Sequence, residues 1–463
     1  SIRRQRQMCI RDRDKDGVVT YYSTYTAAKN ASGNNPGDHD LIQIWADLLT
    51  EQIVLKDKVD IWIMPGVVIN SGNSQTTIVA PTTGALNCRI YGQGKIKNHT
   101  IGNCIFINNP NANLVIECDT IEGNGGSSVS VNIQNAYKFH LTCNKVYNRD
   151  WQAIRFGQLL APGLIQDINL NISKVETGNI TTTSPFTGTT AITTRGNGFL
   201  KINEVLVRNA GHCLSHREGI ITARINKLTS INNSISYPAA VHVRQYSGNS
   251  DTGNQKIILY FDEIQALTGV VTTNLSCAGV EIGEGTGIFI GRKVYSRDNP
   301  AFQIVGANTK GYLKCNEIIS QGRANNSPVS AIELNNFTNE LTVIANYIQG
   351  YRNNGVVFIN DANVKIKNAK LVNTYTGTDV SSLGLFIAGT KIISLINVEI
   401  VTGELTNGRT IYHTGTTVSE SFDLKNYGLF VNKAIDSNLK LLIGTGLSDP
   451  NYNYQYIVDS SLI

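Results

Sequence analysis

The chain has 463 residues, of which only 16% are charged, and its formal net charge is +5 at pH 7. Residues 1–13 contain five Arg and one Asp, so the remainder of the chain is close to neutral, at +1. This near-neutral balance argues against nucleic-acid binding, because phosphate recognition depends on clustered Lys and Arg. No apolar run reaches the length of roughly 20 residues that a membrane-spanning helix needs.

The first residues do not fit the rest of the chain. The segment from Arg3 to Asp12 back-translates, codon for codon, into a sequence that resembles a transposase-type sequencing adapter. We therefore interpret residues 1–13 as an assembly artefact, with a natural basic tail as the alternative. On this interpretation the native N-terminus is not visible, and the presence of an upstream signal peptide or virion anchor stays open.

Residues 14–50 are expected to form an N-terminal cap and the first strands. Residues 18–22 have a strand pattern, and residues 25–30 favour one or two helical turns that end before Gly33. A cap is needed if the chain is a solenoid, because an open end exposes apolar surface and unpaired strand edges. The alternating segments that follow, each typical of a strand, are residues 41–45, 51–55 and 59–63.

A short phrase recurs along the chain at intervals of up to 36 residues. It consists of an apolar or small residue, then in most copies Asn or Asp, then one or two residues, and then Val, Ile or Leu. Asn and Asp tolerate a left-handed backbone, so the phrase predicts a sharp bend between two strands. The Asn and Asp residues of this predicted ladder are Asp119, Asn144, Asn203, Asn226, Asp262, Asn316, Asn346, Asn368 and Asn397.

A bend at one register in every repeat predicts a coil, in which each repeat is one turn of a parallel stack. The phrase resembles the corners of the right-handed parallel β-helix of the pectin-lyase-like superfamily, including pectate lyases and phage tailspikes. This resemblance implies an all-β, right-handed parallel β-helix of about 11 or more coils over residues 51–432. It also implies that the ladder asparagines point inward and stack on one another.

Seven Cys residues remain once Cys9 is set aside, and an odd number at unrelated spacings argues against a full disulfide framework. Cys118, Cys143 and Cys315 each stand directly before the ladder position. We expect them to be small apolar core residues rather than redox centres.

Each phrase is preceded by a shorter strand, and residues exposed on those strands are the expected site of function. Counted from the start of each strand, Arg195, Arg217 and Arg244 share an outward register in three successive coils. Three arginines at a spacing of about 4.8 Å would form a basic stripe suited to an acidic glycan. A neighbouring outward register contains Ser215, His242, Glu281 and Glu333.

The same residues allow two other interpretations. The arginines could instead pair with Glu218, Glu281 or Glu284 in a solvated ion network. Alternatively, the surface could be catalytic, as in the lyases and glycosidases of similar folds. The predicted binding residues are Arg195, Arg217, Arg244, His242 and Glu281, and the catalytic candidates are Arg217, Arg244, His242, Glu218 and Glu281.

No metal or cofactor is expected. His212, Cys213 and His216 alternate between the two faces of a strand and cannot converge on one ion. The polygalacturonase motifs are absent apart from a faint similarity at Gly211 to Cys213, and the calcium-binding acidic cluster of pectate lyases is not visible. The resemblance does allow Arg217 or Arg244 to stand where a lyase keeps a basic residue.

The leading hypothesis is a β-helical spike or fibre-type protein, of phage or bacterial-surface origin, that binds a polysaccharide or cell-surface glycan along its flank. The alternatives are a polysaccharide lyase or glycoside hydrolase on the same scaffold, and a purely structural stalk. Its expected location is extracellular or virion-associated. Residues 433–463 are expected to form the last coil and a C-terminal β cap, or instead an oligomerisation surface such as that of a homotrimer.

Overall fold

The computed structural model describes two compact units, Ser1–Ile225 and Asn226–Ile463, and the division falls within strand β18 (Ile220–Asn232). The described residues of the first unit are 10–13, 19–32, 40–72, 75–100, 102–124, 128–157, 165–178, 190–208 and 211–225. Those of the second unit are 226–232, 239–244, 255–268, 278–297, 299–305, 309–322, 329–334, 340–351, 356–360, 362–374, 383–388, 392–401, 409–414, 419–424, 431–432 and 439–440.

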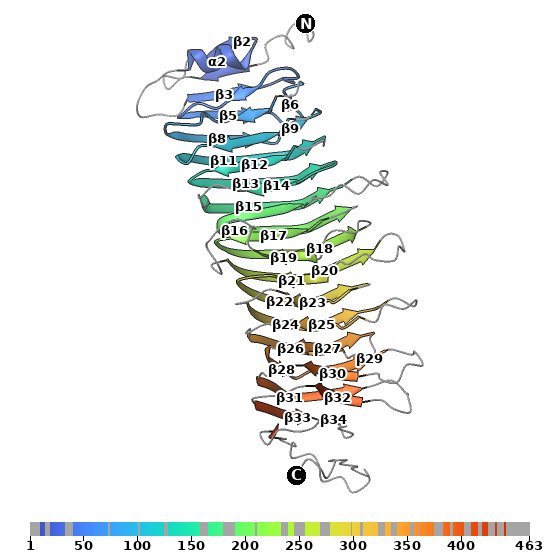
Figure 1. Ribbon diagram of the computed structural model, residues 1–463. Coiled ribbons are helices and arrows are strands. Elements are labelled where there is room, and N and C mark those ends of the chain that lie inside the picture. The colour runs from blue at the N-terminus through green and yellow to red at the C-terminus, as the bar shows by residue number, and fades with distance from the viewer. Residues whose placement is uncertain are drawn as a thin grey trace. The chain divides into compact units, whose positions relative to one another are not determined.

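The first unit begins with a cap built around helix α2 (Tyr25–Ala31) (Figure 1). The hydroxyl of Thr24 accepts the backbone N–H of Ala27, which is a standard helix N-cap. The carboxylate of Glu51 accepts the N–H groups of Tyr25 and Thr26 at 2.8 and 2.7 Å. The predicted helix is therefore confirmed, and its first turn is fixed by a side chain from the solenoid.

The cap also contains strands β1 (Ile10–Arg13) and β2 (Val19–Tyr22). Strand β1 pairs antiparallel with β2 on one side and with β3 (Asp40–Ile44) on the other. Residues 10–13 thus take part in the cap sheet, between β2 and β3. Their origin as an assembly artefact stays a prediction.

The rest of the first unit is a parallel β-solenoid whose strands belong to two sheets. In each sheet, a strand pairs in parallel with the strand one turn further along the chain. Besides β3, sheet A contains β5 (Val59–Ile63), β6 (Val68–Asn70), β8 (Leu86–Gly92), β9 (Lys95–Asn98), β11 (Ala112–Gly123), β13 (Lys138–Asn148), β15 (Ile165–Thr177) and most of β16 (Ile192–Arg208). Sheet B contains β4 (Ile53–Val54), β7 (Ile78–Val79), β10 (Ile105–Asn108), β12 (Val131–Asn135), β14 (Ile154–Phe156), the start of β16 and β17 (Leu214–Glu218).

The second unit continues the same two-sheet pattern, again with parallel pairing from turn to turn. Its sheet A strands are β20 (Lys256–Thr268), β22 (Thr286–Ser296), β24 (Lys310–Ser320), β26 (Glu340–Gly350), β28 (Asn363–Lys367), β29 (Lys370–Asn373), β31 (Ile392–Val401), β33 (Ser419–Leu424) and β35 (Leu439–Lys440). Its sheet B strands are β19 (Ala239–Val243), β21 (Ala278–Ile282), β23 (Phe302–Ile304), β25 (Ile332–Leu334), β27 (Val357–Asn360), β30 (Leu383–Ala388), β32 (Arg409–Thr414) and β34 (Val431–Asn432).

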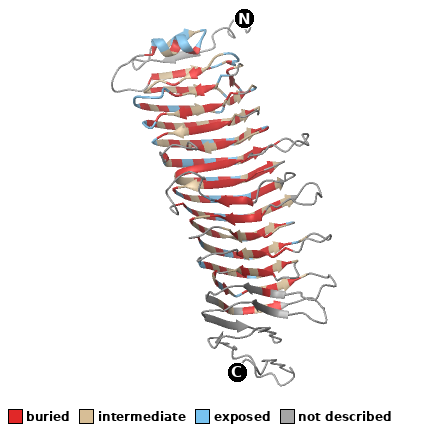
Figure 2. Cartoon of the chain, viewed as in Figure 1, coloured by how far each residue is buried: buried red, intermediate tan, exposed pale blue. Residues whose placement is uncertain are grey.

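Buried residues alternate with half-buried or exposed ones along most described strands (Figure 2). Successive side chains of a strand point to opposite faces, so one face of each strand lies in the core. Strand β11 shows this with Leu114 and Ile116, both fully buried, between half-buried neighbours. The fold class is confirmed as an all-β parallel β-solenoid with about 9 turns in the described part, close to the predicted count. The predicted C-terminal cap, over residues 433–463, lies outside the described residues except for 439–440.

The repeated phrase does mark a bend. In β11 and β13, Cys118 pairs with Cys143 and Thr120 with Lys145, and the burial alternation changes phase between these pairs. The left-handed backbone that we expected is present at Asn368, with a φ of 55°, and the other described ladder residues turn without it.

The prediction that the ladder side chains point inward is wrong. A change of phase places the corner residue on the convex side of the bend, away from the core. Asn144 accordingly donates to Asp119 across the outer surface, with 2.9 Å between Nδ2 and Oδ1. The side chain of Asp119 is half-buried, that of Asn397 lies outside the described residues, and those of Asn144, Asn203, Asn226, Asp262, Asn316, Asn346 and Asn368 are exposed.

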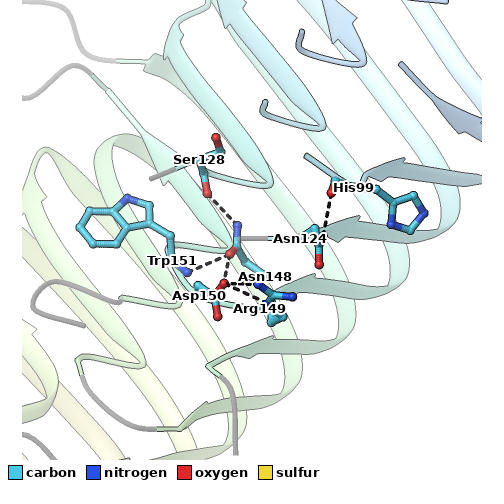
Figure 3. Close-up of polar contacts among 7 residues, drawn as sticks. All are labelled: His99, Asn124, Ser128, Asn148, Arg149, Asp150 and Trp151. Carbon is cyan, nitrogen blue, oxygen red and sulfur yellow. Dashed lines mark hydrogen bonds and ion pairs between the residues drawn. The ribbon is translucent and has the colours of Figure 1, made fainter. Parts of the chain in front are cut away.

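A different, buried row of polar residues ties the coils internally. The amide of Asn148 donates to Ser128 O at 2.8 Å, and its Oδ1 accepts from the N–H groups of Asp150 and Trp151 at 3.2 and 2.9 Å (Figure 3). The fully buried Asn98 makes equivalent bonds to Gln75 O and Thr100 N. The other buried polar side chains at the corresponding position are Thr177, Ser230, Ser296, Ser320 and Asn373.

Candidate ligand-binding surface

In the first unit, the outer side of sheet B presents one polar register. Asn132 pairs with Arg155, Arg155 with Thr193, and Thr193 with Ser215. Asn132 and Arg155 each stand between two inward-facing apolar residues. Thr193 on β16 and Ser215 on β17 each stand between one apolar and one polar inward-facing residue. The parallel pairing therefore aligns four polar side chains at intervals of about 4.8 Å.

This polar register is covered rather than open to solvent. Asn132 and Thr193 are each 7% exposed, and Ser215 is fully buried. Asn132 Oδ1 and Ser215 Oγ are buried and have no hydrogen-bond partner within the described part of the chain. Buried polar atoms normally have a partner, from the protein, from water or from a ligand. The register is thus a place where an external hydrogen-bonding group would be stabilised.

Arg195 lies beside this register but does not form the predicted stripe. A bulge in β17 between the partners of Thr194 and Arg195 inserts one residue, so Arg195 pairs with Glu218 and not with Arg217. The predicted shared register of Arg195 and Arg217 is therefore wrong. Arg244 belongs to the second unit, where it is exposed and lies over Gly283.

The guanidinium of Arg195 is neutralised by Glu218. Arg195 Nε and Glu218 Oε2 are 2.9 Å apart, and the arginine side chain is only 3% exposed. This contact supports the ion-pair interpretation for Arg195. Its Nη1 is buried and makes no hydrogen bond to a described residue.

Below this surface, two polar residues face the core. His216 and Thr194 occur in one inward register and are fully buried, with 2.9 Å between His216 Nδ1 and Thr194 Oγ1. His216 Nε2 lies 3.0 Å from Gly219 O, so Nε2 is the protonated nitrogen that donates to this carbonyl. The histidine therefore locks the turn between β17 and β18. Among the described residues, no three His, Cys, Asp or Glu side chains are placed to hold a metal ion.

In the second unit, the outer register of sheet B is acidic. His242 pairs with Glu281, Glu281 with Gln303, and Gln303 with Glu333. His242 Nε2 lies 3.2 Å from Glu281 Oε1, and the amide of Gln303 donates to the other carboxylate oxygen. The His242 and Glu281 side chains are 5% and 3% exposed, whereas Gln303 and Glu333 are half-buried.

Sequence reasoning placed His242, Glu281 and Glu333 in one register, as the structure does, but it missed Gln303. It also missed the uncharged members of the first unit's register, Asn132 and Thr193. The available signal was positional, since each of these residues is the polar centre of a short apolar strand. The sequence analysis placed Ser215 in an outward register but did not extend that register to Asn132, Arg155 and Thr193.

No protein-family model, curated protein or solved structure matches this chain. The fold and the surface therefore define a class only, a parallel β-solenoid with a partly covered polar register along the outer side of sheet B. In the described part of the chain, no helix has the length and apolar character needed to cross a membrane.

Proposed function

We propose that this chain is a spike or fibre-type β-solenoid protein that binds a polysaccharide along the outer side of sheet B. The observation that carries the proposal is the set of buried polar atoms without a described partner in the first unit, namely Asn132 Oδ1, Arg195 Nη1 and Ser215 Oγ. A sugar hydroxyl both donates and accepts, so it can satisfy acceptors and donors on one face.

The charges of the surface favour an uncharged glycan over an acidic one. Arg195 is already paired with Glu218, so it offers no net positive charge. In the second unit, Glu281 and Glu333 occupy one register with Gln303 between them, and a polyanion would be repelled there. Carboxylate and amide oxygens can instead accept hydrogen bonds from the hydroxyl groups of a neutral polysaccharide.

The resemblance to tailspike and pectin-lyase-like chains motivates the finer parts of the proposal. These are a phage or bacterial-surface origin, an extracellular or virion-associated location and a homotrimeric assembly. Light scattering on the purified chain tests the assembly directly, since a trimer has three times the mass of the 50.5 kDa protomer.

Binding is tested by titrating the full chain with a panel of neutral and acidic polysaccharides in isothermal calorimetry. We expect Ser215→Ala and Glu333→Ala to weaken binding of a neutral glycan by about 1–3 kcal/mol each, as for a lost hydrogen-bond partner. Asn169→Ala, an exposed position on sheet A, is the matched control and should bind normally. Absence of binding to every glycan, or equal loss in the control, would contradict the proposal.

Hydrolysis of the bound glycan is the second candidate function, and one observation favours it. Glu281 and Glu333 share a register two strands apart, which places their backbones about 10 Å from each other. Inverting glycosidases keep their two carboxyl groups roughly 6.5–9.5 Å apart. Release of new reducing ends, lost in Glu333→Gln, would establish this activity, and release of unsaturated ends would indicate a lyase instead.

A further inference from the structure

Two cysteines meet inside the first unit. Cys118 of β11 and Cys143 of β13 are direct partners in the parallel register of sheet A. Both side chains face the core, at 7% and 5% exposure, and both stand immediately before the bend. The two thiols therefore belong to neighbouring turns, at one position of the repeat.

The spacing of the strands brings the two residues within the range of a disulfide. Neighbouring strands lie about 4.8 Å apart, and disulfide-linked residues have Cα atoms about 4.4–6.8 Å apart. The two thiols also affect each other: interaction with Cys143, together with burial, raises the pKa of the Cys118 thiol. The Cβ atoms of two residues in register lie about one strand spacing apart. Disulfide formation therefore requires these atoms to approach to the usual Cβ–Cβ separation of about 3.8 Å.

Two other described cysteines, Cys315 and Cys88, have no thiol opposite them in sheet A. Cys315 pairs with Gly291 and Ala345, neither of which has a thiol. Cys88 pairs with Leu114 and donates to Val59 O at 3.0 Å. Within the described part of the chain, Cys118 and Cys143 are thus the pair that sheet pairing places side by side.

We propose that Cys118 and Cys143 form an oxidative modification site, at which a small disulfide oxidant closes a bond between two adjacent turns. One thiolate attacks the oxidant RSSR and forms a mixed disulfide, releasing the first RSH. The second thiolate attacks the protein sulfur of that intermediate, forms the Cys118–Cys143 bond and displaces the second RSH. Two protein thiols are oxidised, and one RSSR is reduced to two RSH.

The raised pKa of Cys118 determines the rate of this reaction. The thiolate is the nucleophile, so a buried thiol whose pKa is raised reacts slowly at neutral pH and faster at higher pH. Once formed, the bond links residues that are 25 positions apart and restricts the unfolded chain. We therefore expect the oxidised first unit to melt at a higher temperature than the reduced one.

The test incubates the full chain with oxidised glutathione at about pH 8.5, near the ordinary thiol pKa. The free thiols are then alkylated in denaturant, and the digested protein is analysed by mass spectrometry. A parallel sample is refolded in the same oxidant, so that access to the core does not limit the result. We expect a linked peptide pair containing Cys118 and Cys143, two hydrogen atoms lighter than the reduced peptides, and a raised melting temperature.

Three variants make the result decisive. Cys118→Ser and Cys143→Ser should each abolish the linked pair and the shift in melting temperature, whereas Cys315→Ser should retain both. Complete alkylation of both cysteines after refolding in the oxidant would overturn the proposal. A stable glutathione adduct in place of the link, or a bond that joins either cysteine to a different one, would overturn it as well.

Discussion

At the scale of single residues, two asparagines near the bend of β13 have different environments. Asn148 is fully buried and makes hydrogen bonds to four groups: Ser128 O, Ser130 Oγ and the backbone N–H groups of Asp150 and Trp151. Asn144, four positions earlier, is exposed and bonded to Asp119. Burial removes the option of bonding to water, so the hydrogen bonds of Asn148 contribute more to stability than that of Asn144.

We expect Asn148→Ala to lower the free energy of unfolding by about 1–3 kcal/mol, because it leaves buried backbone groups without partners. Asn144→Ala, the matched control, should change it by less than about 0.5 kcal/mol, as is usual for an exposed position. Urea denaturation, followed through a signal that comes from the first unit, measures the change in the free energy of unfolding for both variants. If the two substitutions lowered the free energy of unfolding equally, the buried row would not be what stabilises the bends.

Glu176 is a second residue whose environment predicts a measurable effect. Burial acts to raise the pKa of its carboxyl group, but Lys145, Lys174 and Arg208 outweigh burial and lower it below 4.5. A lowered pKa in the folded state means that the stabilisation is present above the unfolded pKa. It is lost as the pH falls through the folded value.

The stability advantage of the wild-type chain over Glu176→Gln should therefore be largest near neutral pH and shrink under acid conditions. Melting temperatures of both proteins, measured from neutral pH to below pH 4, test this expectation. A difference that stays constant over the whole range would contradict the ionic origin of the stabilisation.

At the scale of elements, β1 lies between β2 and β3 in the cap sheet. The pairing covers Ile10 to Arg13 in full on both sides. Removing residues 1–13 exposes the edge of β3, and unpaired edges are destabilising or aggregation-prone. We therefore expect the deletion to lower the melting temperature of the first unit and to increase aggregation.

The same deletion decides between the structure and the sequence-based interpretation of this segment. If residues 1–13 are an assembly artefact, a chain that begins at Asp14 should be as stable as the complete one. An unchanged melting temperature in differential scanning calorimetry would therefore show that β1 contributes nothing to the cap.

The elements of the solenoid also explain why the buried row escaped detection. Its members stand two residues after the last aliphatic residue of each phrase, as in Val146 to Asn148 and Leu371 to Asn373. Where the side chain is not polar, it is that of Gly, Ala or Val, as at Gly123, Ala266 and Val207. At Gly123 a Cβ would lie 2.4 Å from Ser130 Oγ and 3.0 Å from Asn148 Nδ2. Residues of several types, polar and apolar, thus occupy this position, so no single residue type marks the row in the sequence.

At the scale of the whole molecule, the balance of charges predicts how glycan binding responds to salt. Arg195 is neutralised by Glu218, and the register of the second unit is acidic, so attraction of a polyanion is not the driving force. Raising the salt concentration from about 0.1 M to about 1 M shortens the Debye length from about 10 Å to about 3 Å. We expect the dissociation constant for a neutral glycan to change less than about threefold, which is about 0.7 kcal/mol.

Calorimetric titrations at the two salt concentrations measure this response. A steep loss of affinity would instead show that attraction between exposed charges contributes to binding. It would also mean that the acidic-glycan hypothesis describes the molecule better than the present one.

The sequence alone determined the architecture. A phrase with Asn or Asp at one register, preceded by alternating apolar residues, requires repeated bends between strands, and a repeated bend closes only as a coil. It also placed Cys118, Cys143 and Cys315 in the core and His242, Glu281 and Glu333 in one outer register. These are consequences of strand periodicity, which is a local property of the chain.

Only the tertiary structure decided which side of each bend a residue occupies and which residues meet across turns. A change of phase at the corner turned the ladder outward, and one bulge in β17 replaced Arg217 by Glu218 as the partner of Arg195. The pairing of Cys118 with Cys143 likewise depends on register across a whole turn. A shift of one residue reverses the face of a side chain, and such shifts arise from packing between turns rather than from local sequence.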